Sequence, residues 1–233
     1  MLALKEQLKN YQFYYRPRRI YRRALMTLFN PDPYPPEFIE RKIIFIHIPK
    51  TAGQAVAESL FGTSSLSHAT ARRFQRARPE LFRASLKFTF VRHPVGRFLS
   101  AFSFLKGGGM TELDAYWSHA FLRDCPDVHQ FIERLQESRF RREVMGYLHF
   151  IPQWKFVADR QGKCIVDFTG RYENLSADFE YIRSKIGIGS PLKEVNVSDR
   201  AIKKAQVLEP DERRFVTDLY KADMDFFGYE EPK

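Results

Sequence analysis

The sequence predicts an α/β protein with a three-layer α/β/α architecture, in which helices cover both faces of a central parallel sheet. Two runs of β-branched and aromatic residues, Lys42–Ile48 and Leu86–Arg92, have the composition of buried strands, and each leads into a helical pattern. Strands that alternate with helices favour parallel pairing, because the chain must cross the sheet between parallel neighbours. The length of 233 residues and the hydrophobic content of 44% suit one soluble domain with a substantial core.

The first 36 residues are expected to form an arm and a linker outside this domain, which we place at residues 37–233. The segment Tyr11–Phe29 mixes aromatic residues with five arginines and is expected to form one or two short helices, broken near Pro17. The segment Asn30–Pro36 is rich in proline, so neither a helix nor a central strand is expected there. The basic, aromatic arm suits peripheral contact with an anionic membrane surface, or docking on its own domain or a partner subunit.

The remaining elements follow in order from the same kinds of signal. After the first strand, Ala55–Leu60 is an amphipathic helix; after the second, Pro94 takes the favoured first-turn position of a helix over Val95–Leu105. Farther along, Trp154–Asp159 and Lys163–Thr169 are expected to form a hairpin or a turn into a third core strand. Further helices are expected at residues 112–123, 127–137, 174–186, 199–207 and 210–222.

The net charge of +10 is concentrated in two segments. Residues 1–42 hold nine Lys and Arg against four Asp and Glu, and residues 70–97 hold eight against one. Such clusters favour a partner with several negative charges, whether a nucleotide, an anionic polymer or a membrane surface, although solubility alone can also explain them.

Several classes of protein are disfavoured by the composition. No run of about 18 apolar residues is present, so no transmembrane helix is expected. The N-terminus lacks the apolar stretch of a signal peptide, and a cytoplasmic location is therefore expected. The two cysteines, Cys125 and Cys164, are too far apart for a metal motif, and a disulfide scaffold is implausible at this chain length. Both are expected to be buried thiols.

A turn suited to binding an anion joins the first strand to its helix. It reads Pro49-Lys50-Thr51-Ala52-Gly53-Gln54-Ala55. The N–H groups and the positive dipole end of a helix N-terminus favour a phosphate there, Lys50 adds a mobile charge, and Gly53 allows the backbone to approach a ligand. The turn is not a Walker A motif, in which the lysine and the hydroxyl residue follow the glycine. The alternative is an ordinary surface turn.

A second candidate anion site follows the second strand. Arg92 lies at the carboxyl end of that strand, where open α/β sheets bind their ligands. Arg97 and Ser100 share one face of the next helix at spacing i, i+3. Together they offer guanidinium groups and a hydroxyl to a second phosphate. The alternative is that Arg92 forms a structural ion pair and Ser100 is a small packing residue.

The two motifs together resemble those of the sulfotransferases that use 3'-phosphoadenosine 5'-phosphosulfate (PAPS). In that family a Pro-Lys-Thr-x-Gly-Thr motif binds the 5'-phosphosulfate and an Arg-x-Pro-x-x-Arg-x-x-Ser motif binds the 3'-phosphate; here the motifs are Pro49–Gln54 and Arg92–Ser100. The resemblance runs from about Lys42 to Tyr229 and is closest to the bacterial and Golgi carbohydrate sulfotransferases. It implies the sulfotransferase fold, which is like that of the P-loop nucleoside triphosphate hydrolases. Other matching landmarks are Ser67–Ala71, Val166–Leu175 and Phe226–Tyr229.

The resemblance also implies a role for each site residue. It assigns the 5'-phosphosulfate to Lys50, Thr51, Ala52, Gly53, Gln54 and Ala55, the 3'-phosphate to Arg92, Arg97 and Ser100, and the adenine to Tyr172. His68 is the candidate general base, because imidazole titrates near neutrality and the attacking hydroxyl must lose a proton. Lys50 is also expected to stabilise the departing phosphate. No metal ion is expected, since a sulfuryl group carries less charge than a phosphoryl group.

The first motif departs from the family pattern at two positions. Gln54 and Ala55 stand where the family has a threonine followed by a serine or threonine. A hydroxyl contact with the phosphate is lost, although the amide of Gln54 offers a donor instead. This departure affects the expected activity more than the expected nucleotide binding.

The expected reaction is transfer of SO₃ from PAPS to a hydroxyl of a carbohydrate or glycan-type acceptor, with release of 3',5'-ADP. The arginine-rich segment Ala71–Arg78 follows His68 and suits an anionic sugar chain or a glycolipid, although a solvated helix face explains it too. The alternatives are a nucleotide or small-molecule kinase, a non-catalytic nucleotide-binding relative and a nucleic-acid-binding protein. No nucleic acid partner is expected, because nucleic acid binding leaves the spacing of the two anion sites unexplained.

Overall fold

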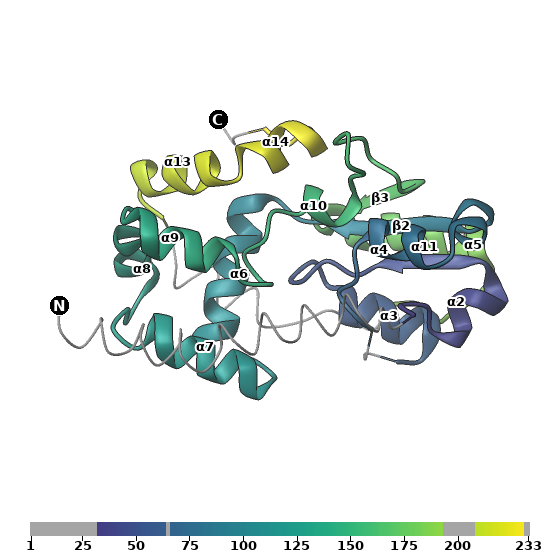
Figure 1. The fold of residues 1–233 in the computed structure, drawn as a ribbon, viewed down its shortest axis with the longest axis horizontal. Helices are drawn as coiled ribbons and strands as arrows, with labels where there is room; N and C mark the ends of the chain where they lie inside the picture. The colour runs from purple at the N-terminus through teal and green to yellow at the C-terminus, as the bar shows by residue number, and fades with distance from the viewer. Residues whose placement is uncertain (1–31, 64–65, 193–207, 231–233) are drawn as a thin grey trace.

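Three parallel strands form the centre of the molecule (Figure 1). The structure, a computed structural model, describes residues 32–63, 66–192 and 208–230. Within these residues the sheet has the order β1 (Ile43–Ile46), β2 (Leu86–Val91), β3 (Phe168–Arg171). Ile43 pairs with Leu86, and Phe88 pairs with Phe168. The predicted parallel sheet is confirmed.

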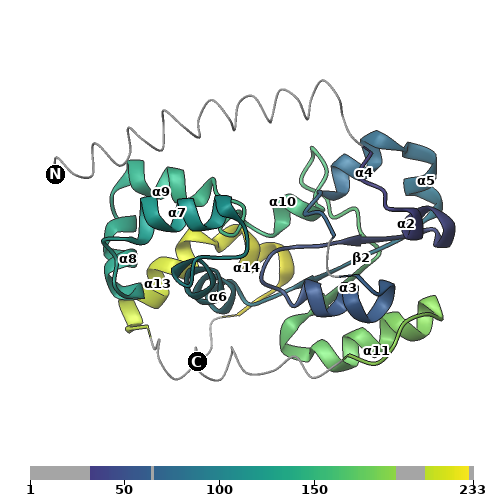
Figure 2. The ribbon, with the colours of Figure 1, turned by 90° about the horizontal axis from the view of Figure 1, so that it is seen from below.

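Helices cover both faces of this sheet, as the three-layer prediction requires. On one face lie α3 (Gly53–Phe61) and α11 (Leu175–Ile186), and on the other lie α4 (Ala71–Ala77) and α10 (Trp154–Val157), as Figure 2 shows from below. Two short helices, α2 (Pro36–Arg41) and α5 (Pro79–Ala84), lead into β1 and β2. Every residue of β1 is buried, which explains its uninterrupted apolar sequence.

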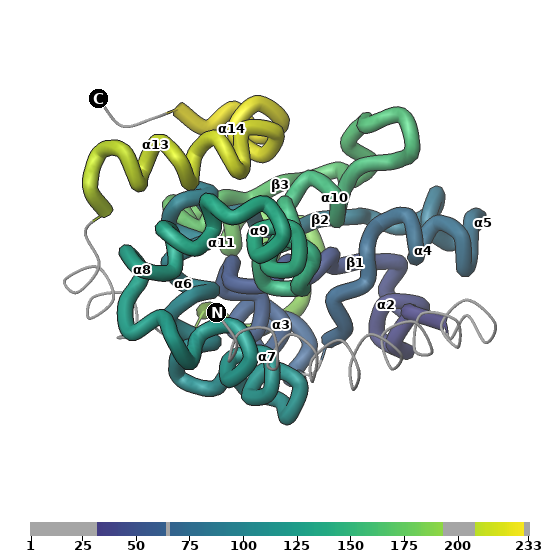
Figure 3. The backbone as a smooth tube through the Cα atoms, turned by 60° about the vertical axis from the view of Figure 1, so that its left-hand side comes forward, coloured from purple at the N-terminus to yellow at the C-terminus, as the bar shows by residue number. Residues whose placement is uncertain are grey.

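A second group of helices packs beyond the carboxyl ends of the strands (Figure 3). It consists of α6 (Pro94–Lys106), α7 (Glu112–Leu122), α8 (Val128–Leu135), α9 (Ser138–Met145) and α13 (Pro210–Leu219). The core that these helices share is aromatic, with Phe98, Trp117, Phe131 and Phe150 buried in it. The ring of Trp117 stacks on that of Tyr147 with centroids 4.5 Å apart. This core is distinct from the one around the sheet, and it explains much of the aromatic content of the chain.

Several predicted boundaries shift. The first strand ends at Ile46 and its helix begins at Gly53, two residues earlier than expected in each case. The third strand begins only at Phe168. The single helix expected over residues 210–222 is two helices, because Tyr220 (φ −113°, ψ 22°) leaves the helical conformation before α14 (Lys221–Phe227). Helices α2, α4, α5 and α9 have no counterpart in the prediction.

Two expectations about local structure are wrong. Of the two alternatives for Trp154–Asp159 and Lys163–Thr169, the hairpin is wrong: helix α10 occupies Trp154–Val157, and a single antiparallel bridge joins Ala158 to Cys164 before the chain turns into β3. Pro36 opens α2 rather than ending a helix-free linker, because proline is tolerated in a first turn. Cys125 is a buried thiol as expected, whereas Cys164 is only half-buried. The basic arm helices and the helix expected at 199–207 lie outside the described residues.

Helix α14 is hydrogen-bonded to the segment at the start of α10. Asp223 is fully buried, and its carboxylate accepts the backbone N–H groups of Gln153 (2.8 Å) and Trp154 (2.9 Å). Burial raises the pKa of Asp223, and the nearby Arg97 opposes that rise. One residue before α14, the hydroxyl of Tyr220 donates to the carbonyl of Phe150 at 2.9 Å. These contacts join residues about 70 positions apart in the chain.

We expect Asp223→Ala to lower the free energy of unfolding by about 2–4 kcal/mol, because two buried N–H groups lose their acceptor and Arg97 loses a nearby carboxylate. Asp225→Ala is the matched control on the same helix: its carboxylate is 66% exposed and pairs only with Lys221 at the surface, so we expect a change below about 0.5 kcal/mol. Urea unfolding of both variants measures the difference. Equal losses would contradict a specific role for Asp223.

Candidate functional site

The turn between β1 and α3 holds two residues in the left-handed conformation. Lys50 has φ of 69° and Ala52 has φ of 64°, although neither is glycine. Thr51 lies fully buried between them, and its hydroxyl donates to the carbonyl of Ile48 at 2.9 Å. Such backbone conformations cost free energy and are concentrated at ligand sites. The turn therefore has a fixed shape, and the Thr51 hydroxyl maintains that shape.

The N-terminus of α3 presents backbone N–H groups to the turn. The first helical hydrogen bond runs from the N–H of Val56 to the carbonyl of Ala52 (3.1 Å), so the N–H groups of Gly53, Gln54 and Ala55 precede it. No side chain among the described residues caps this end, and its first turn contains no acidic residue. These are the groups that the predicted 5'-phosphosulfate site requires.

Gly53 is required by a contact behind the turn. A Cβ atom at this position would lie 2.0 Å from Cδ2 of His47, so no other residue fits without a shift. His47 is itself buried, and its ring stacks on Phe45 with centroids 5.7 Å apart. The His47 ring is thus a second reason for this glycine, beside the close approach of a ligand that the sequence predicts.

His68 lies beside the turn through its contact with His47. The two ring centroids are 4.3 Å apart, and Nδ1 of His68 is 2.9 Å from the carbonyl oxygen of His47. A carbonyl oxygen only accepts, so Nδ1 carries the proton and Nε2 keeps the lone pair of a neutral ring. Burial lowers the pKa of His68 below its usual value and lowers that of His47 to about 3. Both rings are therefore neutral at pH 7, and His68 is in the tautomer that can take a proton at Nε2.

Arg92 and Tyr172 meet at the ends of β2 and β3. The guanidinium carbon of Arg92 is 4.1 Å from the centroid of the Tyr172 ring. Both amide atoms of Gln153 pair with the backbone of Arg92, at 3.0 Å to its N–H and 2.8 Å to its carbonyl. A Cβ at Gly96 would lie 3.3 Å from Nε of Arg92, so this glycine leaves room for the arginine side chain. Ser100 is buried on α6, one helix turn farther along.

Arg97 takes a different position from the one expected. It is only 1% exposed, and its guanidinium nitrogens lie 3.1 Å from the carbonyl of His149, 3.4 Å from that of Pro49 and 2.5 Å from that of Ile151. These carbonyls accept N–H groups of both terminal nitrogens, and the buried Nε has no hydrogen-bond partner among the described residues. Arg97 therefore supports the turn from behind, where the sequence analysis expected it to face a ligand.

The C-terminal segment closes the site next to β3. The carboxylate of Glu173 accepts the backbone N–H of His93 (2.7 Å) and the hydroxyl of Tyr229 (3.0 Å). The ring of Tyr229 also contacts the ring of His93 (5.3 Å) and the guanidinium of Arg171 (4.4 Å). Tyr229 and Glu173 both lie in landmark segments that the sequence predicts, whereas Gln153 was not predicted, because a single glutamine has no distinctive pattern.

The side chains of Lys50 and Gln54 extend from the turn toward α6 and the loop that follows α6. The ammonium of Lys50 lies 3.8 Å from the centroid of the Phe104 ring. The side-chain amide of Gln54 lies 3.3 Å from the sulfur of Met110, which is 69% exposed. Gln54 is thus directed along the surface toward Met110.

Three groups of predicted residues converge at one edge of the sheet. Residues 50–55 follow β1, Arg92 follows β2 and Tyr172 follows β3, and these strands are neighbours in a parallel sheet. Parallel strands end at the same edge, where α/β proteins bind their ligands. The structure thus brings together residues that are far apart in the sequence. His68 contacts His47 behind the turn, and Arg97 donates to the carbonyl of Pro49.

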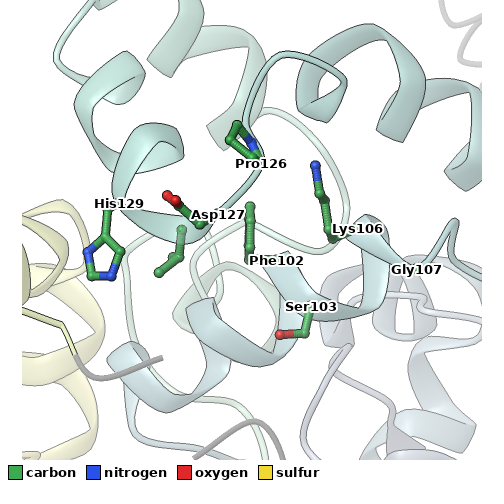
Figure 4. Close-up of a pocket in the computed structure, with 8 residues that line it drawn as sticks. Phe102, Ser103, Lys106, Gly107, Pro126, Asp127 and His129 are labelled. Atoms are coloured by element: carbon green, nitrogen blue, oxygen red, sulfur yellow. The ribbon is translucent and has the colours of Figure 1, made fainter. Parts of the chain in front are cut away.

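A separate hollow of about 410 Å³ lies between α6 and the start of α8 (Figure 4). Its lining includes Ser103, Lys106, Asp127 and His129, and none of the predicted site residues. The ammonium of Lys106 donates to the carbonyls of Leu122 (3.0 Å) and Cys125 (2.6 Å). The side chain that would attract an anion here is therefore already bonded within the fold.

The central parallel sheet with helices on both faces defines a three-layer α/β protein, a class that commonly binds ligands at the carboxyl ends of its strands. A model of the sulfotransferase family matches residues 39–230, which is most of the chain. The chain therefore belongs to the sulfotransferase family, whose members transfer sulfuryl groups. No curated protein and no solved structure matches it.

No helix among the described residues is both long and apolar enough to cross a membrane. In the same part of the chain, no three His, Cys, Asp or Glu side chains gather in the way that binds a metal ion.

We expect Gly53→Ala to lower the free energy of unfolding by about 1–3 kcal/mol, because the new methyl group collides with His47. In the double variant with His47→Ala the collision is removed, so the loss should be smaller than the sum of the two single losses. Gly107→Ala is the control, since a Cβ there meets only ordinary contacts at 3.5 Å. Thermal or urea unfolding measures all four variants, and strictly additive losses would refute the proposed collision.

Proposed function

We propose that the protein transfers the sulfuryl group of PAPS to a hydroxyl of a carbohydrate or glycan-type acceptor. The main support is that two separate anion sites, after β1 and after β2, lie at neighbouring strand ends in a chain of the sulfotransferase family. PAPS is charged at both its 5' and 3' positions, so it matches two sites better than a nucleotide phosphorylated at one end.

The proposed site for the 5'-phosphosulfate is the turn and the start of α3. The N–H groups of Gly53, Gln54 and Ala55 precede the first helical hydrogen bond, and the helix dipole adds to their attraction for an anion. Lys50 supplies the mobile positive charge, and Thr51 contributes through the turn that its hydroxyl closes. The backbone can thus bind the phosphate despite the absence of hydroxyl side chains at positions 54 and 55.

The proposed site for the 3'-phosphate is formed by Arg92 and Ser100. Gln153 fixes the backbone of Arg92, and Gly96 leaves room for its side chain. Arg97 is not a ligand in this proposal, because its side chain is buried and both terminal nitrogens are bonded to carbonyls. The adenine is proposed to contact Tyr172, whose ring already carries the Arg92 guanidinium.

The proposed reaction is an in-line displacement at sulfur. The acceptor oxygen bonds to sulfur while the bond from sulfur to the bridging phosphate oxygen breaks, and Lys50 stabilises the charge that develops on that oxygen. The proton of the acceptor hydroxyl goes to Nε2 of His68, whose tautomer suits this role. The products are 3',5'-ADP and a sulfate ester, and no metal ion is needed for these steps.

The acceptor is proposed to approach from the side of α4. Arg72, Arg73 and Arg76 lie on this helix, which begins three residues after His68. Such a basic helix suits an anionic glycan or a glycolipid headgroup. We further propose that the protein acts in the cytoplasm, with the basic arm of residues 1–36 in peripheral contact with a membrane.

We expect 3',5'-ADP to bind at least about tenfold more tightly than ADP or ATP, because only 3',5'-ADP occupies both anion sites. Calorimetry measures the three affinities. Arg92→Ala should abolish the preference, whereas Arg83→Ala, an exposed arginine on α5, should retain it. Equal binding of ATP with a requirement for Mg²⁺ would refute the proposal and favour a kinase. Steeply salt-dependent binding of DNA or RNA would favour a nucleic-acid-binding protein.

We expect His68→Ala to retain its affinity for 3',5'-ADP but to lose transfer by about 10²-fold or more, because the attacking hydroxyl keeps its proton. The assay follows labelled sulfate from PAPS into a panel of polysaccharides and glycolipids. His119→Ala, at an exposed position on α7, is the control and should transfer at the wild-type rate. Unchanged turnover in His68→Ala would exclude His68 as the base.

A further inference from the structure

Two residues of α6 contact the turn that follows β1. Arg97 donates to the carbonyl of Pro49 at 3.4 Å. The centroid of the Phe104 ring lies 3.8 Å from the ammonium of the next residue, Lys50. Arg97 and Phe104 are seven positions apart, which is about two turns of an α-helix, so they lie on the same face of α6. This face therefore contacts both the backbone and the lysine side chain of the turn.

His149 supports both of these α6 residues. Its carbonyl accepts an N–H group of Arg97 at 3.1 Å, and its ring packs against that of Phe104 with centroids 4.9 Å apart. His149 is itself buried, and its Nε2 lies 3.1 Å from Oδ1 of Asp114. The partly buried Phe104 ring also packs against the aromatic core of the second group of helices. The ring that faces Lys50 thus has fixed surroundings.

The side chain of Lys50 is restrained at both of its ends. Its backbone is in the left-handed conformation, and the following Thr51 closes the turn through its hydrogen bond to the carbonyl of Ile48. A lysine side chain has four rotatable bonds, so its ammonium would otherwise sample many positions. The contact with the face of Phe104 restricts these positions to the region beside the turn.

An aromatic ring can restrain an ammonium group without neutralising it. The face of the ring is negative, and it attracts a cation more strongly where water is partly excluded. A carboxylate in the same place would cancel the charge of Lys50 and compete with a phosphate for its N–H groups. With Phe104 as the partner, Lys50 keeps its positive charge for a ligand at the turn.

We propose that Phe104, which belongs to neither predicted motif, is a positioning residue for Lys50. This proposal rests on the function proposed above. As the acceptor oxygen bonds to sulfur, the bond from sulfur to the bridging oxygen breaks, and its electron pair stays on that oxygen, which becomes a phosphate oxygen of 3',5'-ADP. Lys50 donates a hydrogen bond to this oxygen and keeps its own proton. The Phe104 ring raises kcat because it keeps the ammonium close to where this charge develops.

NMR of the nucleotide-free full chain with isotopically labelled lysine tests the contact itself. Hydrogens above an aromatic ring resonate upfield, so we expect the ε-methylene signal of Lys50 upfield of its position in a solvent-exposed lysine. Lys50→Arg identifies the signal by its disappearance. Phe104→Leu should return the signal to the ordinary position, whereas Phe215→Leu, at a partly buried position on α13, should not. An ordinary position in the wild-type chain would overturn the proposal.

Fluorinated phenylalanines at position 104 test the role of the ring in turnover of PAPS, with the best acceptor of the panel or with water. Each fluorine weakens the negative face of the ring and changes its shape little, so we expect kcat to fall stepwise, by about tenfold over the mono-, di- and trifluoro series. Phe104→Tyr, which keeps the ring face, should retain kcat within about twofold. The affinity for 3',5'-ADP should stay within about threefold, because backbone N–H groups and Arg92 also bind the nucleotide.

Two controls separate the contact with Lys50 from other roles of the ring. The same fluorinated residues at Phe215 should leave kcat unchanged. In Lys50→Met, the residual turnover should not respond to fluorines at position 104, because the ring then has no ammonium to attract.

Two outcomes of the turnover test would overturn the proposal. The first is a kcat that does not respond to the fluorines in a chain that retains Lys50. The second is a fluorine effect that persists in Lys50→Met, which would indicate that the ring contacts the acceptor instead. Failure of the proposed function looks different, since the wild-type chain would then neither bind 3',5'-ADP nor release it from PAPS, and the role of Phe104 would fall with it.

Discussion

The buried guanidinium of Arg97 is the interaction on which the arrangement of the site depends. It donates to carbonyls of the turn after β1 and of the segment before α10, while Tyr220 and Asp223 of the C-terminal segment lie close to it. Burial lowers the pKa of Arg97, yet a guanidinium remains charged, and its Nη1 and Nη2 groups donate to three carbonyls while the buried Nε has no hydrogen-bond partner among the described residues. The fold therefore has to keep these segments together, and Lys50 is held next to α6 as a result.

The two arginines of the motif Arg92–Ser100 therefore have different roles. Arg97 is turned inward and positions the turn from behind, whereas Arg92, five residues earlier, lies against Tyr172 at the edge of the sheet. The same inward bonding connects Pro49 to His149, so the turn that would hold the donor phosphate is tied to the segment before α10. Binding and charge stabilisation are thus proposed to share one rigid support.

The sequence predicted the parts of the structure that depend on local pattern. The parallel sheet, the turn at Lys50 and the helix begun by Pro94 follow from strand composition, proline position and hydrophobic spacing. The inward position of Arg97, the contact between Gly53 and His47 and the bracing of Gln153 by Asp223 depend on residues far apart in the chain, and no local pattern reveals them. Helix α10, at the start of the expected hairpin or turn, also depends on a distant residue, since the carboxylate of Asp223 accepts the N–H of Trp154.

The most direct test of the central claim is a crystal structure with 3',5'-ADP bound. The account predicts the 5'-phosphate against the N–H groups of residues 53–55 and Lys50, and the 3'-phosphate against Arg92 and Ser100. Arg97 should remain bonded to the carbonyls of Pro49, His149 and Ile151. A nucleotide in the hollow between α6 and α8, or an Arg97 side chain that has left the carbonyls to bind a phosphate, would contradict it.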